Sequence, residues 1–194
     1  MSKIYKEDET YKGIDNTLNS LPIGDYENCT FINCDFSKTR LVEINFMDCE
    51  FIDCNFTAAN ISETGFKTVS FKGCKLMGLH FEDSKDILFR VSFDDCNLNM
   101  SSFYKRKLKQ TVFKNCSLQE VDFTEADLTL AVFNHCDLQS AIFDQSNLEQ
   151  TNLSSAFNFS INPDQNRIKK TRFSQDGIIG LTRHLDIIID NQPD

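Results

Sequence analysis

The sequence contains no tryptophan and few of the residues that usually form tight turns, with seven glycines and three prolines among 194 residues. Residues with ordinary side chains must therefore form the turns of this protein. No basic segment followed by an apolar core opens the chain, and no apolar run approaches the roughly 18 residues that a membrane span needs. These absences predict a soluble protein that is not exported and does not associate with a membrane, and we expect it in the cytoplasm.

The motifs of common enzyme classes are absent as well. The sequence has no P-loop, no GxGxxG, no GxSxG and no HExxH. The three histidines, His80, His135 and His184, are far apart, and neither a CxxC pair nor a Cys/His zinc spacing occurs. We therefore expect no catalytic residues, no metal site and no cofactor, and predict that the protein acts by binding.

The net charge limits the kind of partner. A charge of −9 argues against direct binding to nucleic acid, which is itself a polyanion. The same charge suits a protein partner with a basic surface. Ordinary solubility is the alternative explanation of the charge.

The strongest pattern in the chain is a strict period of five over residues 118–148. Every fifth residue is Leu or Phe, and a smaller residue precedes it by two places. The large residues are Leu118, Phe123, Leu128, Phe133, Leu138, Phe143 and Leu148. Neither an α-helix, with 3.6 residues per turn, nor a strand, with a period of two, produces this spacing. It indicates a chain that turns a corner every five residues.

The same register extends from Leu21 to Leu153 with one interruption. The step from Phe81 to Leu88 is seven residues instead of five, so two extra residues lie within residues 82–87. We expect Leu88 to be the next inward-facing residue after this insertion.

Strings such as CTFINCDF, CEFIDCNF, EADLTLAVFNHCDL and SNLEQTNL resemble those of the pentapeptide-repeat proteins. The resemblance covers most of the chain. It implies an all-β fold, a right-handed quadrilateral β-helix with four pentads per coil, in which the Leu/Phe and the small residue point inward. We expect about seven coils, roughly 34 Å in length at about 4.8 Å per coil, with a short C-terminal helix and strand as a cap.

All eight cysteines occupy the small inward position. Cys29 and Cys49 fall on one column of the β-helix, and the other six fall on the adjacent column, which consists of Cys34, Cys54, Cys74, Cys96, Cys116 and Cys136. Coil spacing alone would allow stacked cysteines to form disulfides. We expect reduced, buried thiols that pack as small hydrophobes, with metal binding or redox chemistry as the alternatives.

Two charged residues, Asp86 and Arg106, also fall on small inward positions, one coil apart and beside the insertion. If both point inward, they should pair, because a lone buried charge is costly. The alternative is that the insertion turns Asp86 outward and lets Arg106 reach solvent.

The chain divides into three segments on this reading: residues 1–20 as an extended N-terminal cap, 21–160 as the β-helix and 161–194 as a C-terminal tail. Solenoids need atypical ends that cover the core and the strand edges. In the tail, Pro163 should end the last coil, and we expect a helix over 175–184 followed by a strand over 186–190. The resemblance implies that this tail joins two copies into a homodimer, through Ile178, Leu181, Leu185, Ile187 and Ile189. Capping of a monomer is the alternative.

The acidic residues concentrate towards the C-terminal half of the repeat. Between Lys114 and Pro163 there is no Lys or Arg, and this stretch carries Glu120, Asp122, Glu125, Asp127, Asp137, Asp144 and Glu149. Over the corresponding length, duplex DNA carries a similar density of negative charge.

Some pentapeptide-repeat proteins, including those of the quinolone-resistance type, are regarded as DNA mimics that occupy the basic groove of type II topoisomerases. The resemblance therefore implies DNA gyrase or topoisomerase IV as a partner. This chain lacks the long loops of the quinolone-resistance type, having only the two-residue insertion. The alternative function is a structural or scaffolding module that binds another protein.

Overall fold

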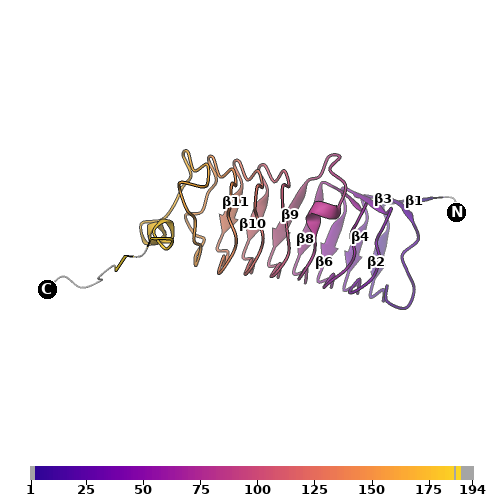
Figure 1. Cartoon of the computed structure of the whole chain (residues 1–194). Helices are drawn as coiled ribbons and strands as arrows, with labels where there is room; N and C mark the ends of the chain where they lie inside the picture. Colours follow the sequence, from indigo (N-terminus) through magenta and orange to yellow (C-terminus); the bar gives the residue numbers. More distant parts are fainter. Residues whose placement is uncertain (1–2, 186, 189–194) are drawn as a thin grey trace.

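The protein is a right-handed quadrilateral β-helix, as the sequence predicts, and it forms an elongated rod in the computed structural model (Figure 1). The structure describes residues 3–185, 187 and 188. Its strands are short and belong to about seven coils. They are β1 (Ile4–Glu7), β2 (Thr10–Lys12), β3 (Gly24–Glu27), β4 (Thr30–Ile32), β5 (Asn45–Met47), β6 (Glu50–Ile52), β7 (Gly65–Lys67), β8 (Val69–Lys72), β9 (Val91–Asp94), β10 (Val112–Lys114) and β11 (Val132–Asn134).

The strands form two parallel sheets on adjacent faces of the rod. One sheet has the order β1-β3-β5-β7 and the other the order β11-β10-β9-β8-β6-β4-β2. Neighbouring strands pair 20 residues apart, as Phe31 does with Phe51, except across β8 and β9, where Phe71 pairs with Phe93. The two extra residues of the insertion account for that difference. The other two faces are joined by single bridges such as Asp35 with Asn55 and Ser102 with Asp122.

The corners are made mostly by residues other than glycine. Residues two places after the inward Leu or Phe adopt the left-handed conformation, with φ of 52° at Asn33, 55° at Lys38 and 57° at Glu120. Such a φ is unfavourable for these residues in isolation. Most corner N–H groups donate to a carbonyl of the next coil, for example Asn33 to Ile52 at 2.9 Å. This repeated bond stabilises the corner, which explains how the chain turns with so few glycines.

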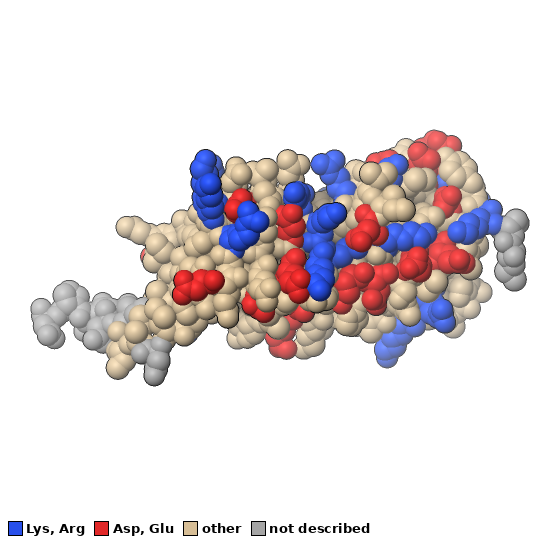
Figure 2. Space-filling view, turned by 45° about the horizontal axis from the view of Figure 1, so that its top comes forward, with Lys and Arg blue, Asp and Glu red and all other residues tan. Residues whose placement is uncertain are grey.

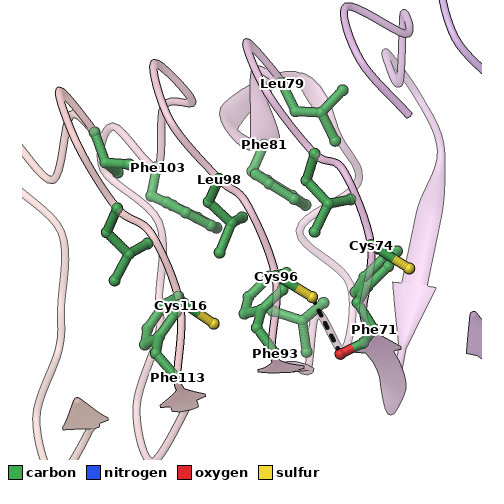
Figure 3. Close-up of a cluster of buried hydrophobic side chains, with 14 of the residues drawn as sticks. Phe71, Cys74, Leu79, Phe81, Phe93, Cys96, Leu98, Phe103, Phe113 and Cys116 are labelled. Atoms are coloured by element: carbon green, nitrogen blue, oxygen red, sulfur yellow. Dashed lines mark hydrogen bonds between the residues drawn. The ribbon is translucent and has the colours of Figure 1, made fainter. Parts of the chain in front are cut away.

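The core is a set of stacked aromatic and aliphatic columns (Figure 3). On the face of the seven-stranded sheet, the ring of Phe51 stacks on Phe31 and Phe71 with centroid distances of 4.7 and 5.2 Å. On the opposite face, Phe103 stacks on Phe81 at 4.5 Å and on Phe123 at 5.5 Å. Within these runs identical residues stack between coils, so neighbouring coils meet surfaces of matching shape.

The β-helix register begins before Leu21 and continues beyond Pro163. Strands β1 and β2 pair with β3 and β4 in the same 20-residue register. At the other end, Arg167 bridges to Asn147, so the expectation that Pro163 ends the last coil is wrong. Asn166 occupies the small inward position and donates from Nδ2 to the Phe143 carbonyl at 2.8 Å. Because this asparagine takes the place of the usual small residue, the pattern of small and apolar residues does not predict this coil from the sequence.

The C-terminal tail differs from its expected form. In place of a helix over 175–184, a single 3₁₀-helix, η2 (Asp176–Leu181), lies against the end of the core. Gly180 is in close contact with the ring of Phe159, where an added Cβ would lie 2.5 Å from ring carbons. Ile187 and Ile188 are in no strand, and the rest of the expected strand over 186–190 lies outside the described residues.

Candidate functional site

The insertion before β9 rearranges the core locally. The short 3₁₀-helix η1 (Phe81–Asp83) precedes it. Leu88 was expected inside but is 65% exposed, and Ile87 beside it is 78% exposed. Phe89 packs against the core instead, with its ring 6.5 Å from that of Phe66 and 6.3 Å from that of Phe81. The left-handed conformation of Leu88, with φ of 56°, shifts the inward position by one residue.

Arg106 holds the insertion from inside. Its side chain is only 3% exposed, and its Nη1 and Nη2 donate to the carbonyls of Ser84 and Lys85 at 3.2 and 3.1 Å. Its guanidinium lies 3.9 Å over the ring of Phe89 and is ion-paired with Asp86. Burial lowers the pKa of Arg106 despite the opposing effect of Asp86.

The pair thus combines the two alternatives that the sequence leaves open. Arg106 points inward, whereas the Asp86 side chain is 87% exposed, and the two are nevertheless in contact. The insertion turns Asp86 outward. The carbonyls of Ser84 and Lys85, also in the insertion, accept the hydrogen bonds of the buried guanidinium that water would otherwise accept.

We expect Arg106→Met to loosen the insertion. The two carbonyls lose their donors, which should lower the free energy of unfolding by about 1–3 kcal/mol. Trypsin should then cleave after Lys85 faster than in the unaltered protein. The exposed neighbour gives a matched control, Lys107→Met, and equal cleavage rates at Lys85 in the two variants would contradict this role.

All eight cysteines are buried and none is bonded to another. Their thiols donate to backbone carbonyls, for example Cys96 Sγ to the Phe71 carbonyl at 3.4 Å (Figure 3). Burial raises the pKa of Cys49 to about 12 and that of Cys29 above its usual range. The thiols of Cys29 and Cys49 therefore stay protonated near neutral pH, which disfavours nucleophilic chemistry at these two residues.

Stability should fall as the pH rises above about 9. The folded state retains the thiol protons that the unfolded state releases, so each such thiol lowers the free energy of unfolding by up to about 1.4 kcal/mol per pH unit. Urea unfolding at pH 8 and pH 10 measures this dependence, and Cys49→Ala should make it shallower. An identical pH dependence in that variant would exclude Cys49 as a source.

The seven C-terminal acidic residues do not form an uninterrupted negative surface. Glu125 pairs with Lys105 at 3.4 Å, Asp127 with Lys109 at 3.3 Å and Glu149 with Arg167 at 2.8 Å. Asp137 accepts from Gln119 and Asn158. Burial opposes ionisation of Asp127, but hydrogen bonds from Thr129 and the charge of Lys109 hold its pKa below the usual range. The cations in these pairs, Lys105, Lys109 and Arg167, lie outside the stretch between Lys114 and Pro163 and reach its acidic residues from neighbouring coils.

A row of acidic residues that the sequence analysis overlooked follows one edge of the rod. We call it the acidic edge; it consists of Glu43, Glu63, Asp83 and Glu125. All four are exposed at the corner between two faces, and the Glu63 N–H donates to the Asp83 carbonyl at 3.0 Å. Within the described part of the chain, the first three make no ion pair. On the view in Figure 2, acidic side chains follow much of the rod, with basic ones between them.

The 20-residue spacing of Glu43 and Glu63 was the signal in the sequence for this edge. Lys105 interrupts it between Asp83 and Glu125 and lies 4.7 Å over the ring of Tyr104.

Among residues 3–185, 187 and 188 there is no group of three or more His, Cys, Asp or Glu arranged to hold a metal ion. In the same part of the chain, no helix is long and apolar enough to cross a membrane.

A β-helix of stacked five-residue units defines the class of solenoid proteins built from pentapeptide repeats. The sequence profile described as "Pentapeptide repeat region" matches residues 25–85 and 86–157. The chain belongs to the pentapeptide-repeat family.

The chain is similar to solved structures. HetL, a pentapeptide-repeat protein involved in heterocyst differentiation regulation from the cyanobacterium Nostoc sp. strain PCC 7120, matches with a TM-score of 0.51 and 15% identity, over 89% of this chain and 84% of that one. QnrB1, a plasmid-mediated fluoroquinolone resistance protein, in a trypsin-treated form, matches with a TM-score of 0.41 and 19% identity, over 96% of this chain and all of that one. A search of curated protein sequences gives no match.

Proposed function

We propose that this protein is a non-enzymatic binding protein that docks its acidic edge on the basic groove of a protein partner. The specific candidate is the DNA-binding groove of a type II topoisomerase, DNA gyrase or topoisomerase IV. The observation that supports this proposal is the alignment of exposed carboxylates along one edge of a stiff rod, where Glu43, Glu63 and Asp83 lack ion pairs within the described residues.

The charge spacing supports the proposal in magnitude. Consecutive coils are about 4.8 Å apart, so the acidic edge extends over roughly 19 Å from Glu43 to Glu125. One strand of DNA carries a phosphate every 3.4 Å or so, about six over that length. The four carboxylates of the edge, less the charge of Lys105 between them, give a net charge of −3, about half that of one DNA strand. The backbone bonds between coils hold them in place, so little ordering is needed on binding.

Two copies joined at their C-terminal ends would extend this acidic surface, and we propose such a homodimer. Ile178, Leu185 and Ile187 are 58%, 49% and 55% exposed and give the tail an apolar surface. Leu181 is half-buried against the core and helps to cap it, while Ile189 lies outside the described residues.

Light scattering should give twice the monomer mass, and Ile178→Asp should return it to the monomer mass.

Inhibition of DNA supercoiling by purified gyrase, or of DNA decatenation by purified topoisomerase IV, tests the proposed function. The protein should inhibit in low salt, and the inhibition should weaken as salt rises, because charge pairing at a surface is screened. No inhibition at any ratio of the two proteins in low salt would contradict the proposal.

A scaffolding role is the second candidate function. Exposed Ile87 and Leu88 at the tip of the insertion favour it, because large adjacent apolar side chains on a surface are typical of protein contacts. Ile87→Ser together with Leu88→Ser should leave topoisomerase inhibition unchanged if the acidic edge carries it. Loss of inhibition in this variant would instead assign binding to the insertion.

A further inference from the structure

A groove runs along a different edge of the rod, where the two sheets meet. Only one or two residues join each strand of the smaller sheet to the next strand of the larger sheet, such as Asn28 and Cys29 between β3 and β4. The groove has a volume of about 710 Å³ and extends over five coils, from Thr30 to Val112. A second hollow of about 380 Å³, whose lining includes Leu130, Val132, Lys170 and Arg172, continues it towards the C-terminus.

The sequence explains why this edge is hollow. After each corner residue, the next side chain points inward, as Cys49 and Val69 do. The following outward residue is often short, as at Thr30, Ser70 and Ser92. Short outward side chains leave room between the corner and the sheet, and the repetition of this pattern in successive coils makes the space continuous.

The charges along the groove change in a fixed order. Asp48 and Glu50 line it near the N-terminal end, and Arg90 lines it two coils further on. Within the described residues, none of these three side chains forms an ion pair. Beyond them, exposed aliphatic side chains join further cations: Val112 lines the groove with Lys109, which is ion-paired with Asp127. Leu130 lines the second hollow with Lys170 and Arg172, and Val112 and Leu130 are 41% and 43% exposed. Along one line the groove therefore offers an acidic site, then a basic one, and then exposed aliphatic side chains among further cations.

We propose that this groove binds an extended peptide that carries a basic, an acidic and an aliphatic side chain in that order. An extended chain advances about 3.3 Å per residue, and two coils span about 9.6 Å, so successive recognised side chains should be about three residues apart. The charges of the groove complement those of the peptide, and the exposed side chains of Val112 and Leu130 contact the aliphatic residue. This site lies on another edge from the acidic edge and is independent of the proposed function.

Fluorescence anisotropy with labelled peptides tests the proposal. The probe has blocked ends and carries Lys, Glu and Val three residues apart with serines between them; a second probe has the reverse sequence, since the peptide can run in either direction. One of the two should bind saturably and about tenfold more tightly than a probe in which Lys and Glu are exchanged.

Charge reversal in the groove provides the decisive comparison. The variant Glu50→Lys/Arg90→Glu should lose affinity for the first probes and gain it for the exchanged probe. The matched control, Asp53→Lys/Lys72→Glu, makes the same changes at exposed positions outside the groove and should bind as the unaltered protein does. Absence of saturable binding by all probes, or equal loss of affinity in the two variants, would overturn the proposal.

Discussion

The variant Phe51→Ala should lose about 3–5 kcal/mol of unfolding free energy, the range for removing a buried phenylalanine. Phe51 is fully buried and stacks on Phe31 and Phe71 in the coils on either side. It also makes edge contacts with Phe46 and Phe56, each with centroids 5.0 Å apart. The fixed coils on both sides prevent the cavity from collapsing, so the loss should be near the upper end of this range.

Denaturant unfolding followed by circular dichroism measures this loss. The control is Lys72→Ala, which removes an exposed side chain next to Phe71 and should change stability little. If Phe51→Ala lost no more than this control, the stacked rings could not be the main source of stability.

Reversal of the acidic edge should have the largest effect on function. The triple variant Glu43→Lys, Glu63→Lys, Asp83→Lys replaces three exposed carboxylates along one line with cations. Each reversed charge would face the basic groove of the partner and repel it, so the concentration needed for half-inhibition of supercoiling should rise at least about tenfold. Supercoiling assays in low salt measure the change.

The control for this triple variant must alter net charge equally. Asp53→Lys, Asp95→Lys and Asp164→Lys do so at exposed positions away from the acidic edge. This variant should inhibit nearly as well as the unaltered protein. Equal weakening in the two variants would mean that net charge, and not the acidic edge, determines binding.

The period of five was sufficient to predict the fold because it reports the corner and the inward position at once. Phe51 and Cys96, for example, were placed inside from their spacing alone, and both are buried. The prediction was wrong where another residue substitutes for the usual one. Asn166 satisfies its amide by bonding to the Phe143 carbonyl, and Phe89 replaces Leu88 because the insertion shifts the register by one residue.

The surface was less predictable because its neighbours come from other coils. Glu149 meets Arg167, which follows it by 18 residues, and Asp127 meets Lys109, which precedes it by 18. A continuous stretch of sequence without Lys or Arg therefore looks more acidic than the surface it forms. The acidic edge is harder to recognise in the sequence than on the surface. Its members are about 20 residues or more apart in the chain and line up only because each coil contains about 20 residues.

If the acidic edge occupies the DNA-binding groove of a topoisomerase, this protein and DNA should compete for the enzyme. Labelled duplex DNA bound to purified gyrase or topoisomerase IV has a high fluorescence anisotropy, which falls when the DNA is released. This protein should displace the DNA at low salt, and the triple variant of the acidic edge should not. DNA that stays bound while this protein binds the same enzyme, or that is not displaced at any concentration, would contradict it.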